Sequence, residues 1–420
     1  MHRSNNPYFG EIRQYLDTIP VIETHEHYTR YQGAGDALQF IVGNYYWSDF
    51  VSAGGEGIPG DLSGEERYEY FLKFYKKSKH TAYAKGMLEG LRICWGIESL
   101  DTYEHFLELE EKLKSRDASL YDETMEKLNI KAKVVDVDIS DFVNGKNADY
   151  SKYCRFAFSL PGFHDLHSKQ DLQKFSRYLK RPVKSLDDYL ESFDNFLEKS
   201  VEFGIVCFKD QTAYRRSIAY GNPTRAEAEK AFNDMVYSPR DVVGDDRARA
   251  LDDWLFHYAL GKAAKHNLPV QIHTGHMAGI RNDIVKTNAS HLTPAIELHE
   301  DVRFDLFHGN WPYMDEYLYL GKNYPNVYLN LCWAQSIDPL YCVEFMKRAV
   351  MTVPHSKIFA FGGDTGMIEW AAGYLSQAKD NVACALSELA ESGWLTPGEA
   401  KQIGFDWFFN NPNEFFGLGL

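Results

Sequence analysis

The fold of this chain is decided by residues 19–27, which read Ile19-Pro20-Val21-Ile22-Glu23-Thr24-His25-Glu26-His27. The apolar start predicts a buried strand, and the stretch ends in a His-x-His motif. Side chains of an extended chain alternate between two faces, so His25 and His27 point the same way at the strand end. Neutral imidazole is a common ligand for zinc and similar divalent ions. The stretch therefore predicts a metal site, provided that later strands bring further ligands.

The composition is that of a globular protein with a sizeable core, because 44% of the residues are hydrophobic and 25% are charged. A length of 420 residues suits a large barrel with insertions. No segment approaches the roughly 18 uncharged apolar residues of a membrane helix, and residues 1–7 lack the apolar core of a signal peptide. A cytoplasmic location is therefore expected. The formal net charge of -15 argues against nucleic acid and anionic membranes as partners.

The cysteines form no C-x-x-C pair, and several lie inside apolar runs. We therefore expect buried thiols rather than disulfides or zinc knuckles. The positions are Cys94, Cys154, Cys207, Cys332, Cys342 and Cys384.

Seven further apolar runs follow the first strand, and helical patterns separate most of them. The runs span residues 133–137, 153–160, 203–209, 269–273, 303–308, 327–331 and 358–364. The helical patterns between them span residues 186–203, 245–266, 292–299, 314–324 and 341–350. Strands that alternate with helices predict a parallel sheet with right-handed crossovers, and eight such units favour a closed (β/α)₈ TIM barrel. An open doubly wound sheet is the alternative, but it would need a glycine-rich phosphate turn where the His-x-His motif stands.

A long segment, roughly residues 30–130, separates the first strand from the second. It is aromatic-rich at residues 45–50 and then helical through residues 65–75, 82–94 and 103–113. We therefore expect one barrel domain over residues 1–420, with a largely helical insertion after the first strand. A cap over an active site and a surface subdomain or dimer contact remain alternative roles for this insertion.

Ligand-type or acid–base side chains end five of the eight predicted strands. Catalytic residues of a TIM barrel lie at the carboxyl ends of its strands, so these side chains are expected to meet at one end of the barrel. Chance could place one or two such residues there, but not so complete a set. The strand-end residues are His25, His27, Lys209, His273, His308 and Asp364.

This pattern resembles the amidohydrolase superfamily, in particular its amidohydrolase-2 branch. The superfamily has His-x-His on the first strand, Lys or Glu on the fourth, His on the fifth and sixth, and Asp on the eighth. The long helical insertion has a weaker likeness to uronate isomerases, at the level of the fold only. The motifs that carry the resemblance are residues 208–215, 273–275, 308–312, 326–330 and 403–417.

The resemblance implies that His25, His27 and Asp364 hold a first metal ion and that His273 completes a mononuclear site. In binuclear members the fourth-strand lysine, here Lys209, is carbamylated and bridges two ions, with the fifth- and sixth-strand histidines on the second. The implied cofactor is one or two divalent ions, zinc foremost, with manganese, iron and cobalt as alternatives.

A bound divalent ion lowers the pKa of its water to about 7, which provides a nucleophile at neutral pH. Asp364 could take the proton of that water and pass it to the leaving group. The metal or His308 would polarise the substrate oxygen. Asp364 and His308 are therefore the expected catalytic residues.

Several of these residues have a second interpretation. Lys209 could be an uncarbamylated lysine, which would imply one metal because an ammonium group repels a divalent ion. Asp364 could be a turn or N-cap aspartate. Arg215 could bind a substrate carboxylate or phosphate, or form a structural salt bridge. His276 could contact substrate from the loop after the fifth strand, or lie in solvent.

The leading hypothesis is a metal-dependent hydrolase acting on an amide, ester or lactone bond of a small polar substrate. A decarboxylase, hydratase or uronate-type isomerase acting on a carboxylated substrate is the first alternative. A catalytically silent metal-binding barrel is an alternative of another class. A small-molecule substrate is the expected partner, and the aromatic-rich helices favour a homo-oligomer.

Overall fold

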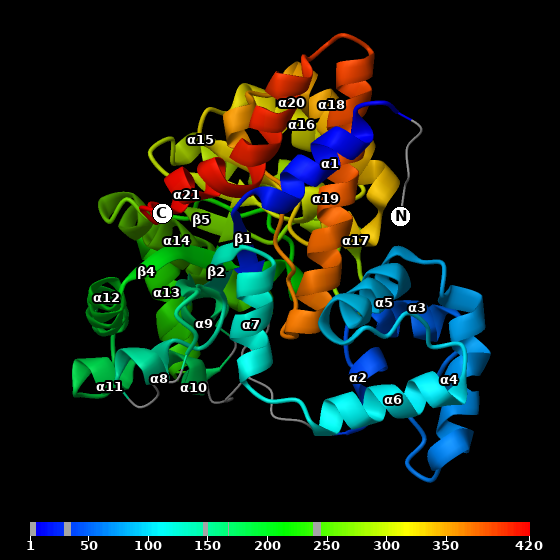
Figure 1. The fold of residues 1–420 in the computed structure, drawn as a ribbon. Helices are drawn as coiled ribbons and strands as arrows, with labels where there is room; N and C mark the ends of the chain where they lie inside the picture. The colour runs from blue at the N-terminus through cyan, green and yellow to red at the C-terminus, as the bar shows by residue number, and fades with distance from the viewer. Residues whose placement is uncertain (1–5, 29–34, 146–149, 167, 238–244) are drawn as a thin grey trace.

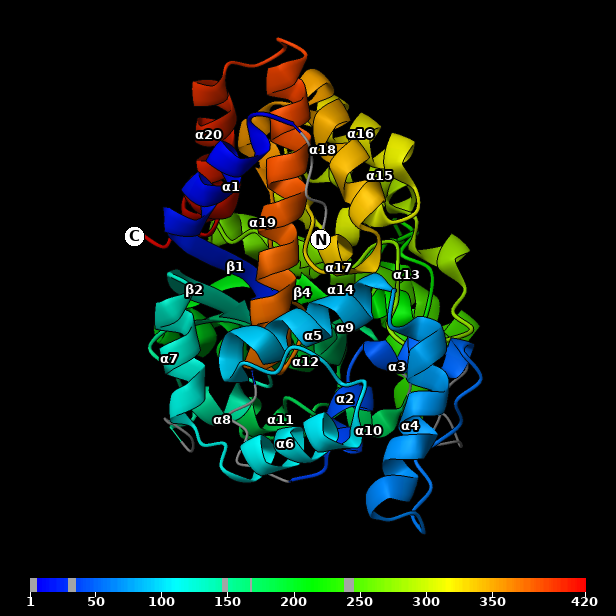
Figure 2. The same cartoon turned by 45° about the vertical axis from the view of Figure 1, so that its right-hand side comes forward.

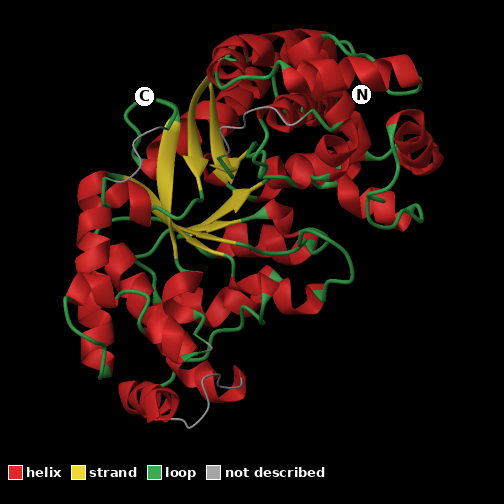
Figure 3. Cartoon of the chain, turned by 90° about the horizontal axis from the view of Figure 1, so that it is seen from below, coloured by secondary structure: helices red, strands yellow, loops and turns green. Residues whose placement is uncertain are grey.

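The computed structural model describes residues 6–28, 35–145, 150–166, 168–237 and 245–420. Its strands form one parallel sheet in the order β1 to β8. Figure 3 shows these strands in the middle of the molecule with helices around them. The strands are β1 (Val21–Glu26), β2 (Ile130–Val135), β3 (Cys154–Ser159), β4 (Ile205–Asp210), β5 (Val270–Ile272), β6 (Phe304–Leu306), β7 (Val327–Asn330) and β8 (Ile358–Phe359).

The sheet closes into the predicted barrel through backbone hydrogen bonds between β1 and the chain that follows β8. Thr24 donates to the carbonyl of Phe361 at 3.0 Å, and His27 donates to the carbonyl of Thr365 at 3.1 Å. These bonds lie beyond the last ladder residue of β8, which ends at Phe359 rather than at residue 364 as predicted. A strand could not have continued through Asp364 in any case, because this residue has a φ of +53°.

Helices surround the strands as the alternating pattern predicts (Figure 1). The predicted helix at residues 186–203 is observed with the same bounds. The helices outside the segment between β1 and β2 are α1 (Phe9–Thr18), α8 (Ser140–Val143), α9 (Pro161–His164), α10 (Lys169–Leu172), α11 (Ser176–Leu179), α12 (Leu186–Phe203), α13 (Arg225–Tyr237), α14 (Asp245–Lys265), α15 (Thr293–Leu298), α16 (Met314–Asn323), α17 (Ala334–Ile337), α18 (Pro339–Thr352), α19 (Ile368–Glu391), α20 (Pro397–Phe405) and α21 (Asn411–Phe416).

The segment between β1 and β2 is helical, as the sequence predicts, although residues 30–34 lie outside the described residues. Most of its helices gather on one side of the molecule in two views, whereas the last one lies beside β2 (Figures 1 and 2). They are α2 (Ala37–Val42), α3 (Tyr46–Ser52), α4 (Gly64–Ser78), α5 (Ala82–Trp95), α6 (Tyr103–Lys114) and α7 (Ser119–Lys127).

Helix α5 fixes this segment to the barrel by packing closely on α19. The two backbones approach where each helix has a glycine. A Cβ atom added at Gly90 would lie 1.9 Å from the carbonyl oxygen of Glu369, and one added at Gly373 would lie 1.9 Å from that of Gly86. Only glycine permits this contact, so the position of the insertion relative to α19 depends on these residues.

The barrel interior contains a buried polar layer next to its ligand-bearing end. The Gln271 amide donates to the carbonyl of Thr24 at 2.9 Å and to the Asp305 carboxylate at 3.0 Å. The Asn330 amide donates to the same carboxylate at 3.0 Å. These hydrogen bonds tie β1, β5, β6 and β7 together.

No helix among the described residues is both long enough and apolar enough to cross a membrane.

Candidate metal centre

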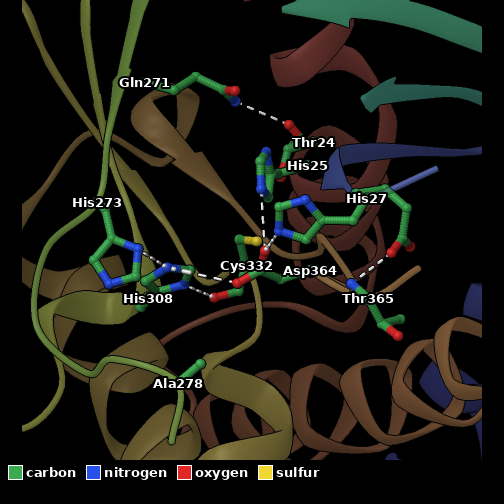
Figure 4. Close-up of polar contacts among 12 residues, drawn as sticks. Thr24, His25, His27, Gln271, His273, Ala278, His308, Cys332, Asp364 and Thr365 are labelled. Atoms are coloured by element: carbon green, nitrogen blue, oxygen red, sulfur yellow. Dashed lines mark hydrogen bonds and ion pairs between the residues drawn. The ribbon is translucent and has the colours of Figure 1, made fainter. Parts of the chain in front are cut away.

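Three of the predicted ligands meet at one carboxylate oxygen at the mouth of the barrel (Figure 4). The Nε2 atom of His25 lies 3.0 Å from Oδ1 of Asp364, and the Nε2 atom of His27 lies 3.1 Å from the same oxygen. His25 lies on β1 and His27 directly follows this strand, and both side chains reach the same oxygen, as the period of two predicts. The two histidines are more than 300 residues from Asp364 in the sequence. They meet it because β1 and the chain after β8 are neighbours in the barrel.

Asp364 is held in its positive-φ conformation by a buried ion cluster behind it. Glu23 accepts a hydrogen bond from the N–H before Asp364 at 2.9 Å, and Glu26 accepts one from the N–H after it. Lys133 on β2 lies between the two carboxylates, with its Nζ 3.0 Å from Glu23 and 3.1 Å from Glu26. The same strand that carries His25 and His27 therefore also positions Asp364.

The tautomers of His273 and His308 follow from their backbone partners. Nδ1 of His308 lies 2.9 Å from the carbonyl oxygen of Cys332, and Nε2 of His273 lies 2.8 Å from that of His276. A carbonyl only accepts, so each ring donates its proton there and a neutral ring keeps a lone pair on its other nitrogen. Those other nitrogens, Nε2 of His308 and Nδ1 of His273, face each other at 3.1 Å. Two lone pairs at that distance repel unless a cation or a proton lies between them.

The charge states of these side chains suit metal ligands. Burial, with a contribution from Lys209, lowers the pKa of His25 to about 3. Burial lowers the pKa of His308 to about 4 and that of His273 well below its usual value. Burial alone would raise the pKa of Asp364, but hydrogen bonding to His25 and His27 holds it well below the usual range. His27 differs, because burial alone would lower its pKa but its hydrogen bond to Asp364 raises it. The site therefore presents three neutral imidazoles and a carboxylate, and His27 would lose its proton when a metal binds.

The spacing of the donor atoms fits a bound divalent ion. Ligand atoms about 2.0–2.1 Å from a tetrahedral zinc ion lie about 3.3 Å from one another. The separations between the Asp364 oxygens and the three nitrogens of His25, His27 and His308 are 3.0, 3.1 and 3.7 Å. A cation bound beside Nε2 of His308 would also remove the repulsion between the two facing histidine nitrogens.

Two further ligand-type side chains lie in the centre and were not predicted as site residues. Asp136, directly after β2, has a carboxylate oxygen within 4.8 Å of ligand nitrogens of His25 and His27. Cys332, two residues after β7, has its sulfur within 4.8 Å of ligand atoms of His308 and Asp364. Both follow the pattern of the other ligands, because each lies at the carboxyl end of a barrel strand. We call the set His25, His27, Asp136, His273, His308, Cys332 and Asp364 the strand-end cluster.

Lys209 lies beside the strand-end cluster and is almost fully buried. Its amino nitrogen is 3.4 Å from the centroid of the Phe307 ring. Burial lowers the pKa of Lys209, against the opposing charges of Asp364 and Asp136. A neutral amine is the form that carbamylation requires, so the lowered pKa is compatible with the predicted carbamate, which stays a prediction.

The two predicted substrate-binding residues have different surroundings. Arg215 forms an ion pair with Asp165 at 3.1 Å, and its side chain is 55% exposed. His276 packs against Trp311 and Trp333, and its Nε2 lies 3.5 Å from the Tyr83 hydroxyl. Arg215 therefore makes the salt bridge of the competing interpretation while also lining a cavity, and substrate contact stays a prediction for both residues.

The cavities lined by residues of the strand-end cluster include two large ones. One has a volume of about 580 Å³ and is lined by His25, His27, Asp364, Lys209 and Arg215 among others. The second has a volume of about 540 Å³, and the α2–α3 segment forms part of its wall. Both volumes suit a small-molecule substrate.

Tyr45 in the α2–α3 segment reaches the centre directly. Its hydroxyl donates to the carbonyl of Asp364, and its ring packs against Trp333 with centroids 4.1 Å apart. Tyr45 also lines both cavities. These contacts agree with the cap interpretation of the insertion. No sequence pattern distinguishes Tyr45 from its aromatic neighbours, so only the tertiary structure identifies it.

Residues 209–401 match a family model described as "Amidohydrolase". Over 225 residues, 51% of the chain, the sequence is 30% identical to protein fluG of Emericella nidulans. The chain spans only 26% of the length of that relative.

Solved structures share the fold over almost the whole chain. The uronate isomerase of Thermotoga maritima has a TM-score of 0.83 at 14% identity, covering 99% of this chain and 100% of its own. The glucuronate isomerase of Caulobacter crescentus has a TM-score of 0.78 at 16% identity, covering 100% of this chain and 97% of its own. At these identities the likeness establishes the TIM-barrel fold, including the helical segment between β1 and β2.

Proposed function

We propose that this chain, whose residues 209–401 match the amidohydrolase family model, is a metal-dependent hydrolase that cleaves an amide, ester or lactone bond of a small polar substrate. The observation that carries the proposal is the convergence of His25 and His27 on Asp364, beside the facing nitrogens of His273 and His308. When bound there, a divalent ion would supply Lewis acidity and would lower the pKa of a coordinated water to about 7.

Asp364 is placed to act as the general base in this proposal. It is buried and lines both cavities, and it keeps a carboxylate because its histidine partners lower its pKa. Its carboxylate would accept the proton of the attacking water and return it to the leaving group. Glu23 and Glu26 would hold the carboxylate in place during both transfers.

The tautomer of His308 favours one of its two predicted roles. With the Nδ1 proton donated to the Cys332 carbonyl, Nε2 carries a lone pair and cannot donate a hydrogen bond to a substrate oxygen. We therefore propose that His308 acts as a ligand, and that a metal ion rather than His308 polarises the substrate.

The test is turnover of a panel of small amides, esters and lactones by zinc- or manganese-loaded protein in water enriched in a heavy oxygen isotope. Hydrolysis must place solvent oxygen in a product. Asp364→Asn should lower turnover by about 10²–10⁴-fold, the usual contribution of a general acid–base residue. Asp234→Asn, at an exposed position on α13, is the matched control and should be unaffected. Full turnover by metal-containing Asp364→Asn would refute the mechanism.

A uronate-type isomerase is the second candidate. It is supported by the two isomerase folds that match this chain from end to end, insertion included. An isomerase would convert a sugar acid such as a uronate without incorporating solvent oxygen. Mass analysis of the products in labelled water therefore separates the two candidates.

A further inference from the structure

Cys332 is a buried thiol at the edge of the strand-end cluster. It lies two residues after β7 and has no exposed surface. Its sulfur and ligand atoms of His308 and Asp364 all lie within 4.8 Å of one another (Figure 4). No disulfide partner competes for this sulfur, since the cysteines are all free.

The Asp364 carboxylate faces two groups of ligands with its two oxygens. Oδ1 receives His25 and His27, whereas Oδ2 lies 3.7 Å from Nε2 of His308. His273 adds its lone pair on the His308 side at 3.1 Å. The carboxylate can therefore bridge two cation positions, and the second position is bordered by His308, His273 and Cys332.

The backbone around Cys332 is built to hold the thiol in this place. Its N–H donates to the Asn330 side chain at 2.9 Å, and its carbonyl accepts from Nδ1 of His308 at 2.9 Å. Trp333 follows with a φ of +61°, an uncommon conformation for a large side chain. Gly362 leaves room for the sulfur, because a Cβ added there would lie 2.7 Å from it. The tautomer of His308 and the position of the Cys332 sulfur therefore both depend on the backbone of Cys332.

We propose that Cys332 is a thiolate ligand at this second cation position, together with His308 and Oδ2 of Asp364. The proposal rests on the metal-dependent part of the proposed function. Coordination would release the thiol proton to solvent, because a metal-bound thiol is deprotonated. A thiolate beside imidazole nitrogens selects a borderline-soft ion such as zinc or cobalt over magnesium or calcium. Such a ligand also accounts for a fully buried thiol among charged side chains.

The first experiment is zinc X-ray absorption on the unmodified, zinc-loaded protein. A zinc–sulfur distance of about 2.3 Å is expected beside nitrogen and oxygen ligands at about 2.0–2.2 Å. Cobalt-loaded protein should also show a thiolate-to-cobalt charge-transfer band in the near ultraviolet. Cys332→Ser should remove that band and weaken zinc binding by at least about tenfold, the loss seen on removing even an outer-shell partner. Cys342→Ser, which removes another buried thiol on α18, is the matched control and should keep both.

The proposal is overturned if the zinc- and cobalt-loaded wild type shows neither sulfur scattering nor the charge-transfer band, or if the band survives in Cys332→Ser. The X-ray absorption and cobalt spectra of the wild type show whether the metal has a sulfur ligand even if a variant fails to fold. Its result is independent of the labelled-oxygen test, because a thiolate ligand is observed whether or not the enzyme hydrolyses its substrate.

Discussion

Lys133→Met should destabilise this protein strongly although Lys133 touches no predicted ligand. Lys133 is 1% exposed and forms ion pairs with Glu23 at 3.0 Å and Glu26 at 3.1 Å. Those two carboxylates accept the backbone N–H groups on either side of Asp364. Methionine fills a similar volume but leaves two carboxylates in a buried site without a cation.

Removing one partner of a buried ion pair typically costs about 3–5 kcal/mol. We expect about 4 kcal/mol here, since one of the two glutamates can take up a proton and limit the penalty. A chain of 420 residues has an unfolding entropy of about 0.9 kcal/mol/K at about 2.1 cal/mol/K per residue. The expected fall in Tm is therefore about 4–5 °C.

The assay is thermal unfolding of metal-free protein followed by circular dichroism, with zinc affinity measured in parallel. Lys131→Met is the matched control, because Lys131 lies on the same strand but is exposed. The control should stay within about 0.5 kcal/mol of wild type. Zinc affinity of Lys133→Met should fall by roughly 10–100-fold, since the Asp364 turn loses its support. A Tm within 1 °C of wild type would show that the ion cluster does not stabilise this turn.

Two further predictions concern pH and metal removal. Burial raises the pKa of Asp305 to about 7, so the folded state keeps a proton that the unfolded state releases near pH 4, and stability falls as pH rises through that window. Asp305→Asn stays neutral, so its stability relative to wild type should rise between pH 5 and pH 8, by at most about 3 kcal/mol. Denaturant unfolding at both pH values checks this, and an unchanged difference contradicts it. Chelation should lower the Tm of metal-loaded wild type, because a ligand at 100 times its Kd contributes about 2.7 kcal/mol. Calorimetry of His25→Ala with and without chelator should show a much smaller shift; an equal shift would place the stabilising ion elsewhere.

The sequence predicted the architecture because the barrel repeats one local signal eight times. Each apolar run buries a short strand, and each amphipathic stretch, such as residues 186–203, covers it with a helix. The predicted strand ends extended too far at β8, where hydrogen bonding passes to β1 around a positive-φ Asp364. Such a bend depends on a partner strand more than 300 residues away, so no local pattern marks it.

The sequence by itself determined which strands carry His25, His27, His273, His308 and Asp364, because strand polarity brings all carboxyl ends of a parallel barrel to one side. Only the tertiary structure decided that the two oxygens of Asp364 face different ligand groups. It also placed Tyr45 of the insertion against the Asp364 turn. The physical reason is that strand periodicity is a short-range property, whereas contacts across the barrel mouth depend on how loops and the insertion pack in three dimensions.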